Sequence, residues 1–124
     1  MEILIKIGTE IQCSAELYDT ATASTIFEAL PLEGTGNTWG EEIYFSIPLA
    51  ITLEEDARDV LEAGELGYWP NMQAFCIFYG PTPASTGNEI RAAGPVNVFG
   101  KITGTLAPLK QIKGGEKVVV EKKS

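Results

Sequence analysis

The chain has 124 residues, of which 44% are hydrophobic and 21% charged, and this length and balance are typical of a single globular domain. Nine lysines and arginines against seventeen acidic residues give a formal net charge of −8, which excludes the basic face that a binder of nucleic acids or anionic membranes needs. The sequence contains no histidine, so imidazole-based catalytic triads and most zinc sites are excluded as well.

The N-terminal segment alternates apolar and polar residues and therefore predicts a β-hairpin. Ile3, Ile5 and Ile7 point to one face, and the alternation resumes at residues 11–17 after a turn at Gly8. No stretch approaches the ~20 apolar residues that a membrane-spanning helix requires, and the first residues lack the pattern of a secretion signal. We therefore expect a cytoplasmic protein.

Residues 23–30 have the spacing of a short helix rather than that of a strand. The apolar stripe of this helix consists of Ala23, Ile26, Phe27 and Leu30. Asp19, Thr20 and Thr22 are candidate N-caps, and Pro31 ends the helix because it cannot donate a hydrogen bond to the preceding turn. A helix this short is stable only when it docks on a sheet.

The middle of the chain contains short strands between turns rich in glycine and proline. We expect strands at residues 38–47 and 73–80, and the second is predicted to be buried on both faces because it is almost continuously apolar. Residues 54–63 fit either a helical turn or a loop that enters a short strand. Residues 80–95, rich in proline, glycine and serine, predict a long loop.

The C-terminal third predicts a strand, a short helix and a last strand. A strand over residues 96–104 leads into a helix over residues 105–113, which Thr105 caps and Gly114 ends. Residues 116–122 form the last strand. Many short strands, turn signals between them and two short helices favour a mostly β protein in the form of a closed antiparallel barrel.

The chain shows no pattern that points to a cofactor or a metal. Cys13 and Cys76 lie in apolar runs and are interpreted as buried, unreactive thiols, and no disulfide between them is implied. The glycines at 34, 36 and 40 do not form a nucleotide-binding loop, and the spacing of acidic residues differs from that of calcium-binding loops. We therefore expect no cofactor and no metal.

Four segments taken together resemble a known family. They read NTWGEEIYFS, GYWP, FYGPTPAS and VNVFGKI, and they are similar to segments of the small cyclophilin-like proteins of bacteria and archaea. The resemblance covers nearly the whole chain. It implies one cyclophilin-like domain over residues 1–124, built as a closed antiparallel β-barrel of about eight strands with helices at its open ends. The family has no established activity.

The resemblance to true cyclophilins does not extend to their catalytic arginine. In cyclophilins the strand that matches this region carries an aromatic residue and then an arginine, whose guanidinium polarises the isomerising amide. Here Trp39 stands near the aromatic position, and Glu41 or Glu42 stands where the arginine is expected. The two arginines of the chain, Arg58 and Arg91, are both expected in loops. Prolyl isomerase activity is therefore doubtful.

Two pairs of adjacent residues are expected to be split between the faces of a strand. Glu41 and Glu42 are expected to point to opposite faces, so they are poor candidates for a catalytic carboxylate pair. We hypothesise that one of them lines a pocket with Trp39, where burial would raise its pKa; the alternative is a solvated carboxylate. Tyr68 and Trp69 precede a proline, which favours extended backbone with one side chain inward and the other outward.

These observations favour a non-catalytic binding module with a surface cleft for a peptide segment or a small ligand, bordered by the loop at residues 80–91. The predicted ligand-binding residues are Trp39, Glu41, Glu42, Tyr44, Tyr68, Trp69 and Phe78. The alternatives are residual prolyl isomerisation, a reaction that uses a glutamate of raised pKa, and a homo-oligomer interface formed by the aromatic strands. No nucleic-acid or membrane partner is expected.

Overall fold

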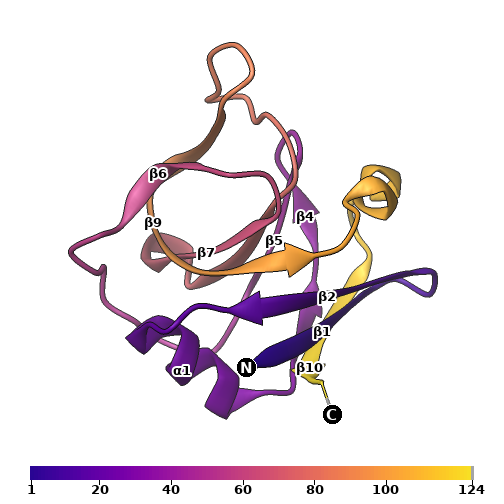
Figure 1. Ribbon diagram of the computed structural model, residues 1–124. Coiled ribbons are helices and arrows are strands. Elements are labelled where there is room, and N and C mark those ends of the chain that lie inside the picture. Colours follow the sequence, from indigo (N-terminus) through magenta and orange to yellow (C-terminus); the bar gives the residue numbers. More distant parts are fainter. Residues whose placement is uncertain (124) are drawn as a thin grey trace.

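The alternating N-terminal residues form the predicted hairpin. In the computed structural model, which describes residues 1–123, β1 (Glu2–Ile7) and β2 (Ile11–Leu17) are antiparallel, with Ile5 opposite Cys13. Gly8 in the turn has a φ of 63°, a left-handed conformation that glycine adopts without strain. β1 also pairs with β10 (Lys117–Lys122), which brings the two ends of the chain together (Figure 1).

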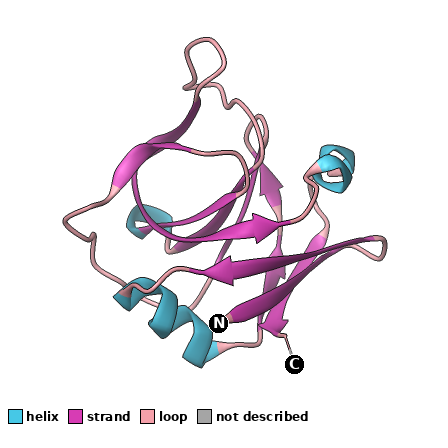
Figure 2. Ribbon diagram, in the orientation of Figure 1, coloured by secondary structure: helices cyan, strands magenta, loops and turns pink. Residues whose placement is uncertain are grey.

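Strands are the predominant regular secondary structure, as Figure 2 shows. The remaining strands are β3 (Leu32–Thr35), β4 (Asn37–Thr38), β5 (Glu42–Ser46), β6 (Arg58–Leu61), β7 (Glu65–Trp69), β8 (Ala74–Phe78) and β9 (Ile90–Thr103). Together with β1, β2 and β10, these strands form one antiparallel sheet in the order β3-β10-β1-β2-β9-β7-β8-β5-β4, and β6 pairs with β9 beside this path. The prediction of a mostly β, antiparallel protein is confirmed.

The predicted closed barrel of about eight strands is not confirmed. The sheet has ten strands, and its ladder of hydrogen bonds ends at β3 on one side and at β4 on the other, without a pairing between them among residues 1–123. β3 and β4 follow each other in the chain, separated by Gly36 alone. Because one extended stretch supplies both edges, the curved sheet meets itself through a covalent connection rather than through paired strands.

One of the two predicted helices is an α-helix. Of the three candidate N-caps of α1 (Ala21–Ala29), the structure selects Thr20, whose Oγ1 accepts a hydrogen bond of 3.0 Å from the N–H of Ala23. The second is a 3₁₀ helix, η2 (Ala107–Gln111), so α1 is the single α-helix of residues 1–123. Pro108 in its first turn and its length of five residues leave little room for α-helical hydrogen bonds. No helix among residues 1–123 is long and apolar enough to span a membrane.

The region predicted as a long loop is partly a strand. β9 begins at Ile90, so the loop ends at Glu89, and Pro95 lies inside the strand. This proline is tolerated because the pairing of β6 with β9 is irregular: Val60 lies opposite Arg91 and Arg58 opposite Val96. The ambiguous residues 54–63 contain β6. Arg58 and Arg91 therefore belong to strands, which corrects their expected position in loops.

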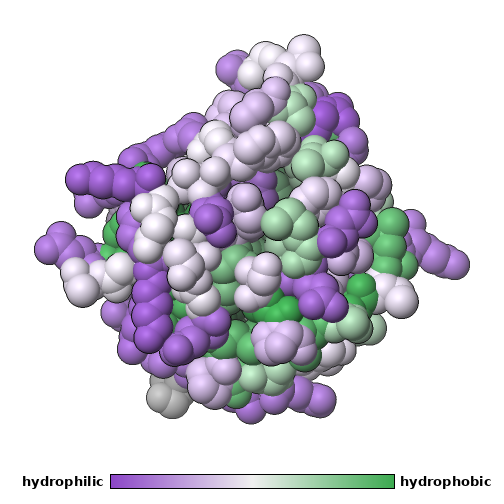
Figure 3. Space-filling model, turned by 180° about the vertical axis from the view of Figure 1, so that it is seen from behind, coloured by the Kyte–Doolittle hydropathy of each residue, from purple (hydrophilic) through white to green (hydrophobic). Residues whose placement is uncertain are grey.

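The sheet buries apolar side chains on both of its faces. The inner cluster lies between the curved sheet and α1 and includes Phe45, Phe75 and Phe99. A smaller outer cluster consists of Leu61, Ala74, Cys76, Phe78, Ile90, Ala92 and Val96. All five residues of β8 are buried, as predicted, because β8 contributes to both clusters. On the face of the molecule seen in Figure 3, hydrophilic side chains surround apolar areas of the surface.

Candidate functional site

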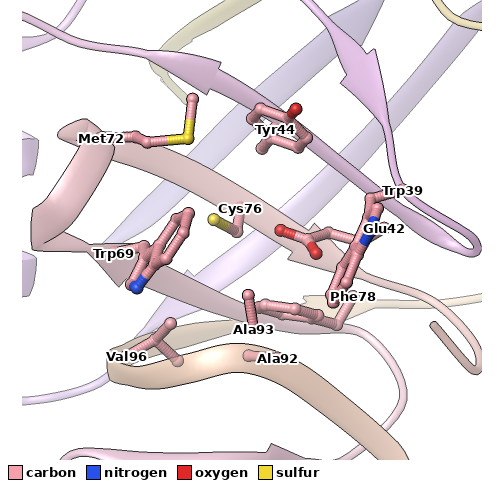
Figure 4. Close-up of a pocket in the computed structure, with 10 residues that line it drawn as sticks. All are labelled: Trp39, Glu42, Tyr44, Trp69, Met72, Cys76, Phe78, Ala92, Ala93 and Val96. Carbon is pink, nitrogen blue, oxygen red and sulfur yellow. The ribbon is translucent and has the colours of Figure 1, made fainter. Parts of the chain in front are cut away.

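A pocket of about 240 Å³ opens beside the outer apolar cluster (Figure 4). Its walls come from the turn before β5, from β5, from the end of β7, from the 3₁₀ helix η1 (Pro70–Met72), from β8 and from β9. The residues that line it are Trp39, Glu42, Tyr44, Trp69, Met72, Cys76, Phe78, Ala92, Ala93 and Val96. The surface inside it is mostly apolar, with few polar groups.

The alternation of two paired strands forms the floor of the pocket. In β5, Ile43 and Phe45 point into the inner core, so Glu42 and Tyr44 point to the outer face. β8 is paired with β5 in a register that sets Glu42 opposite Phe78 and Tyr44 opposite Cys76. These four side chains therefore share one face of the sheet.

A tight turn positions Trp39 at one end of the pocket. The N–H of Trp39 donates a hydrogen bond of 2.9 Å to the carbonyl of Glu42, and Gly40 between them has a φ of 60°. A Cβ atom at Gly40 would lie 2.9 Å from the carbonyl oxygen of Pro81, so glycine is required there. The turn thus packs closely against the loop that follows β8, although no residue of this loop lines the pocket.

Glu42 is a buried carboxylate in this apolar setting. The residue is 6% exposed, and no lysine or arginine forms an ion pair with it in the part of the chain that the structure describes. Burial raises the pKa of Glu42 from 4.5 to about 7, against a smaller lowering by a hydrogen bond with the Cys76 thiol. Burial and the charge of Glu42 raise the pKa of Cys76 well above its ordinary value. Glu42 thus changes charge near neutral pH, whereas Cys76 stays a neutral thiol.

Glu41 lies outside the pocket, on the other side of the sheet. Its Oε2 atom is 2.6 Å from Nζ of Lys110, in an ion pair that is open to solvent. Its backbone N–H donates to the carbonyl of Pro81, and its carbonyl accepts from the N–H of Tyr79. The expected division of the two glutamates between faces is therefore what the structure has, and Glu42 is the one that shares a pocket with Trp39.

Tyr68 and Trp69 are divided in the same way. Tyr68 is fully buried in the inner core, where its hydroxyl donates to the carbonyl of Leu49 at 2.5 Å and accepts from the N–H of Ile51 at 3.2 Å. Trp69 points outward and lines the pocket. Of the seven residues that the sequence singles out, five line the pocket, and Glu41 and Tyr68 do not.

The sequence does not single out the other lining residues. Ala92 and Ala93 lie in a stretch interpreted as loop, so their approach to the pocket depends on the extension of β9 back to Ile90. Cys76 is expected as a buried thiol in an apolar run, but it lies two residues before Phe78 and therefore on the same face of β8, and this spacing is a usable signal. Met72 comes from η1, a local turn that no pattern in the sequence identifies.

Both arginines have partners away from the pocket. Arg58 contacts both carboxylate oxygens of Glu65, at 2.9 and 2.8 Å. Arg91 pairs with Glu89 and with Asp59, both at 2.7 Å. Neither guanidinium lines the pocket. Residues 1–123 also contain no group of three or more Cys, Asp or Glu side chains arranged to hold a metal ion.

Together these features define a mostly β protein with one curved antiparallel sheet and an aromatic pocket that contains a buried carboxylate. The model of the Cyclophilin-like family matches residues 1–121, and the chain belongs to this family, as its sequence motifs indicate. The solution structure of a hypothetical protein from Archaeoglobus fulgidus is similar to the chain, with a TM-score of 0.83 and 40% sequence identity. The match covers 99% of this chain and 95% of that one. No curated protein matches the sequence.

Proposed function

We propose that the protein is a binding module that holds a small ligand, or one side chain of a peptide, in the pocket around Glu42. The observation that carries the proposal is a carboxylate that is almost fully buried and lacks a cationic partner in the described chain. Burying a charge costs free energy unless another group compensates it. A ligand that reaches Glu42 would supply this compensation.

The walls of the pocket support a ligand with an apolar body. Binding sites for small molecules are mostly apolar clefts with a few polar groups that orient the ligand, and this pocket has that composition. Its volume of about 240 Å³ lies below the ~300 Å³ at which pockets for drug-sized ligands begin. The ligand that fits is therefore a small metabolite or a single side chain.

Tryptophan fluorescence provides a direct test, because both tryptophans of the chain, Trp39 and Trp69, line the pocket. We expect at least one member of a metabolite or short-peptide library to change the emission in a saturable way. The Glu42→Gln variant should weaken this binding, whereas Glu41→Gln, which alters the carboxylate on the opposite face, should not. The absence of a saturable change with every compound, or equal effects of the two variants, would contradict the proposal.

A reaction that uses Glu42 as general acid or base is the second candidate function. It is favoured by the pKa of about 7, because a group that is half ionised at neutral pH both accepts and donates protons. Incubation of the same library with the protein, followed by mass spectrometry, tests it. Product formation that Glu42→Gln abolishes and Glu41→Gln retains would favour the enzyme over the binding module.

A further inference from the structure

We propose that the ligand of this pocket carries an alkylated ammonium group, held between the carboxylate of Glu42 and the rings of Trp39, Tyr44 and Trp69. This inference rests on the binding function proposed above. These side chains surround one space in Figure 4, and the carboxylate of Glu42 points into it. The proposal names the chemical class of the ligand, which the binding function by itself leaves open.

Charge complementarity favours a cation over the other ligand classes. Glu42 is the one ionisable group in the pocket that is charged near neutral pH, and the arginines lie elsewhere in ion pairs. Lys110 pairs with Glu41, outside the pocket. An anionic ligand would meet a like charge, and a neutral one would leave the carboxylate uncompensated. A chain with a net charge of −8 also attracts cations from solution.

The aromatic side chains favour an alkylated rather than a primary ammonium. Indole and phenol rings attract cations through their electron-rich faces, and aromatic pockets of this composition are suited to quaternary ammonium groups. A primary ammonium has three N–H donors that need acceptors when buried. Besides Glu42, the pocket offers the Tyr44 hydroxyl and the weak acceptor Cys76, and its other walls are apolar. N-methyl groups need no acceptor and would contact Ala92, Ala93 and Val96.

The proposal predicts that cation binding is linked to the release of a proton from Glu42. The groups that face Glu42 are Tyr44 from β5 and Cys76 from β8, while the turn, β7, η1 and β9 contribute residues that do not titrate. Cys76 stays neutral because burial raises its pKa. Tyr79, which lies beyond the pocket, also stays neutral, because burial and the charge of Glu41 raise its pKa. A fixed cation stabilises the ionised form of Glu42. Because its pKa is about 7, the affinity should be about ten-fold higher at pH 8 than at pH 6.

The test compares choline with its neutral isostere 3,3-dimethylbutan-1-ol, which replaces the nitrogen by carbon at the same size and shape. Binding is measured by tryptophan fluorescence and calorimetry at pH 6 and pH 8. We expect choline to bind more tightly than the isostere, and more tightly at pH 8. Glu42→Gln should remove the pH dependence and reduce the preference for choline over the isostere, to which the rings still contribute, and Glu41→Gln should retain both. Ethanolamine, a primary ammonium of the same length, should bind more weakly than choline.

A second variant keeps the test informative if Glu42→Gln fails to fold. Trp69→Leu removes one ring but retains an apolar wall, and it should weaken choline binding roughly 2- to 30-fold while changing the binding of the isostere less. Equal or tighter binding of the isostere would overturn the ammonium proposal and leave the binding function standing. So would a library ligand that binds in the pocket while choline, at millimolar concentration, does not. If no compound binds, both proposals fail.

Discussion

Glu41 and Glu42 are adjacent in the chain, yet their carboxylates lie on opposite faces of the sheet. Oε2 of Glu41 is 2.6 Å from Nζ of Lys110 at the surface, whereas Glu42 is 6% exposed and lines an apolar pocket. The extended backbone of the β5 edge separates them, because neighbouring side chains on a strand alternate between its faces. The pair therefore supplies a site residue and its own matched control.

The first prediction concerns the pH dependence of stability. Burial raises the pKa of Glu42 from 4.5 to about 7, so the folded state holds a proton that the unfolded state releases between these values. The stability associated with the protonated carboxyl is complete below pH 4.5 and is lost as the pH rises through 7. The free energy of unfolding of Glu42→Gln, compared with that of the wild type at the same pH, should therefore increase by about 3 kcal/mol between pH 4.5 and pH 8.

Urea unfolding at a series of pH values measures this difference. Glu41→Gln is the control, since it removes the neighbouring carboxylate from a solvent-exposed ion pair with Lys110, and its stability relative to the wild type should change little with pH. A Glu42→Gln curve that runs parallel to the wild type over the whole range would show that Glu42 does not titrate in this interval.

The second prediction concerns Glu65, which is 1% exposed. Its burial alone would raise its pKa, but hydrogen bonds from Arg58, from the N–H of Glu62 and from the hydroxyl of Tyr18 outweigh burial, and the pKa is lowered. Arg58→Ala should destabilise the protein by about 2 kcal/mol, less than the ~3–5 kcal/mol of a fully buried pair because two donors remain and Arg58 is partly exposed.

Thermal unfolding at pH 7 and at pH 4 checks this second prediction. A lowered pKa contributes stability above the unfolded value of 4.5, and this stability disappears as the pH falls. The loss in Arg58→Ala should consequently be larger at pH 7. Arg91→Ala is the matched control, because its partners Glu89 and Asp59 lie at the surface, and it should have a much smaller effect. Equal losses in the two variants would refute the buried-pair interpretation.

The third prediction concerns Asn97, which is completely buried in β9. Its Nδ2 donates to Oγ1 of Thr22 at 3.0 Å and to the carbonyl of Thr52 at 2.9 Å, and its Oδ1 accepts from the N–H of Glu54 at 2.7 Å. Asn97→Leu keeps the approximate shape but leaves these groups unpaired, so unfolding should become easier by about 2–4 kcal/mol. Chemical denaturation measures this decrease in the free energy of unfolding, and Asn37→Leu, at an exposed position, is the control. A decrease in Asn97→Leu no larger than that in the control would be inconsistent with this account.

The fourth prediction is that the protein does not accelerate prolyl isomerisation. Neither Arg58 nor Arg91 lines the pocket, so no guanidinium is placed there to stabilise the twisted amide. A protease-coupled assay on a proline-containing peptide should give the spontaneous rate with and without protein. A rate that rises in proportion to protein concentration and is altered by Glu42→Gln would overturn this prediction.

The fifth prediction concerns the two thiols. Burial raises the pKa of Cys13 to about 11 and that of Cys76 well above its ordinary value, and both cysteines are free. The thiolate is the reactive form, so alkylation of the native protein at pH 8 should be slow at both positions and fast in denaturant. Mass spectrometry after a short exposure to iodoacetamide measures the extent of alkylation at each cysteine. Rapid native labelling of Cys76 would mean that the pocket floor opens in solution.

Local patterns predicted the elements and the facing of individual side chains. A helix N-cap among Asp19, Thr20 and Thr22, the doubly buried strand around Cys76 and the division of Tyr68 and Trp69 between two faces all follow from spacing within a few residues. The start of β9 did not, because Gly94 and Pro95 are turn formers by composition and lie inside a strand only because the residues on either side of them pair with β6 and β7.

By itself the sequence determined the alternation that separates Glu41 from Glu42 and the family motifs, whereas the position of Arg58 and Arg91 away from the pocket came from the structure. The tertiary structure decided which glutamate is buried, that Ala92 and Ala93 close the pocket, and that the edges of the sheet meet without pairing. The reason is physical: the direction of a side chain on a strand is a local property of the backbone. Which face of a strand is covered depends on segments far away in the chain, and those come together only when the sheet folds.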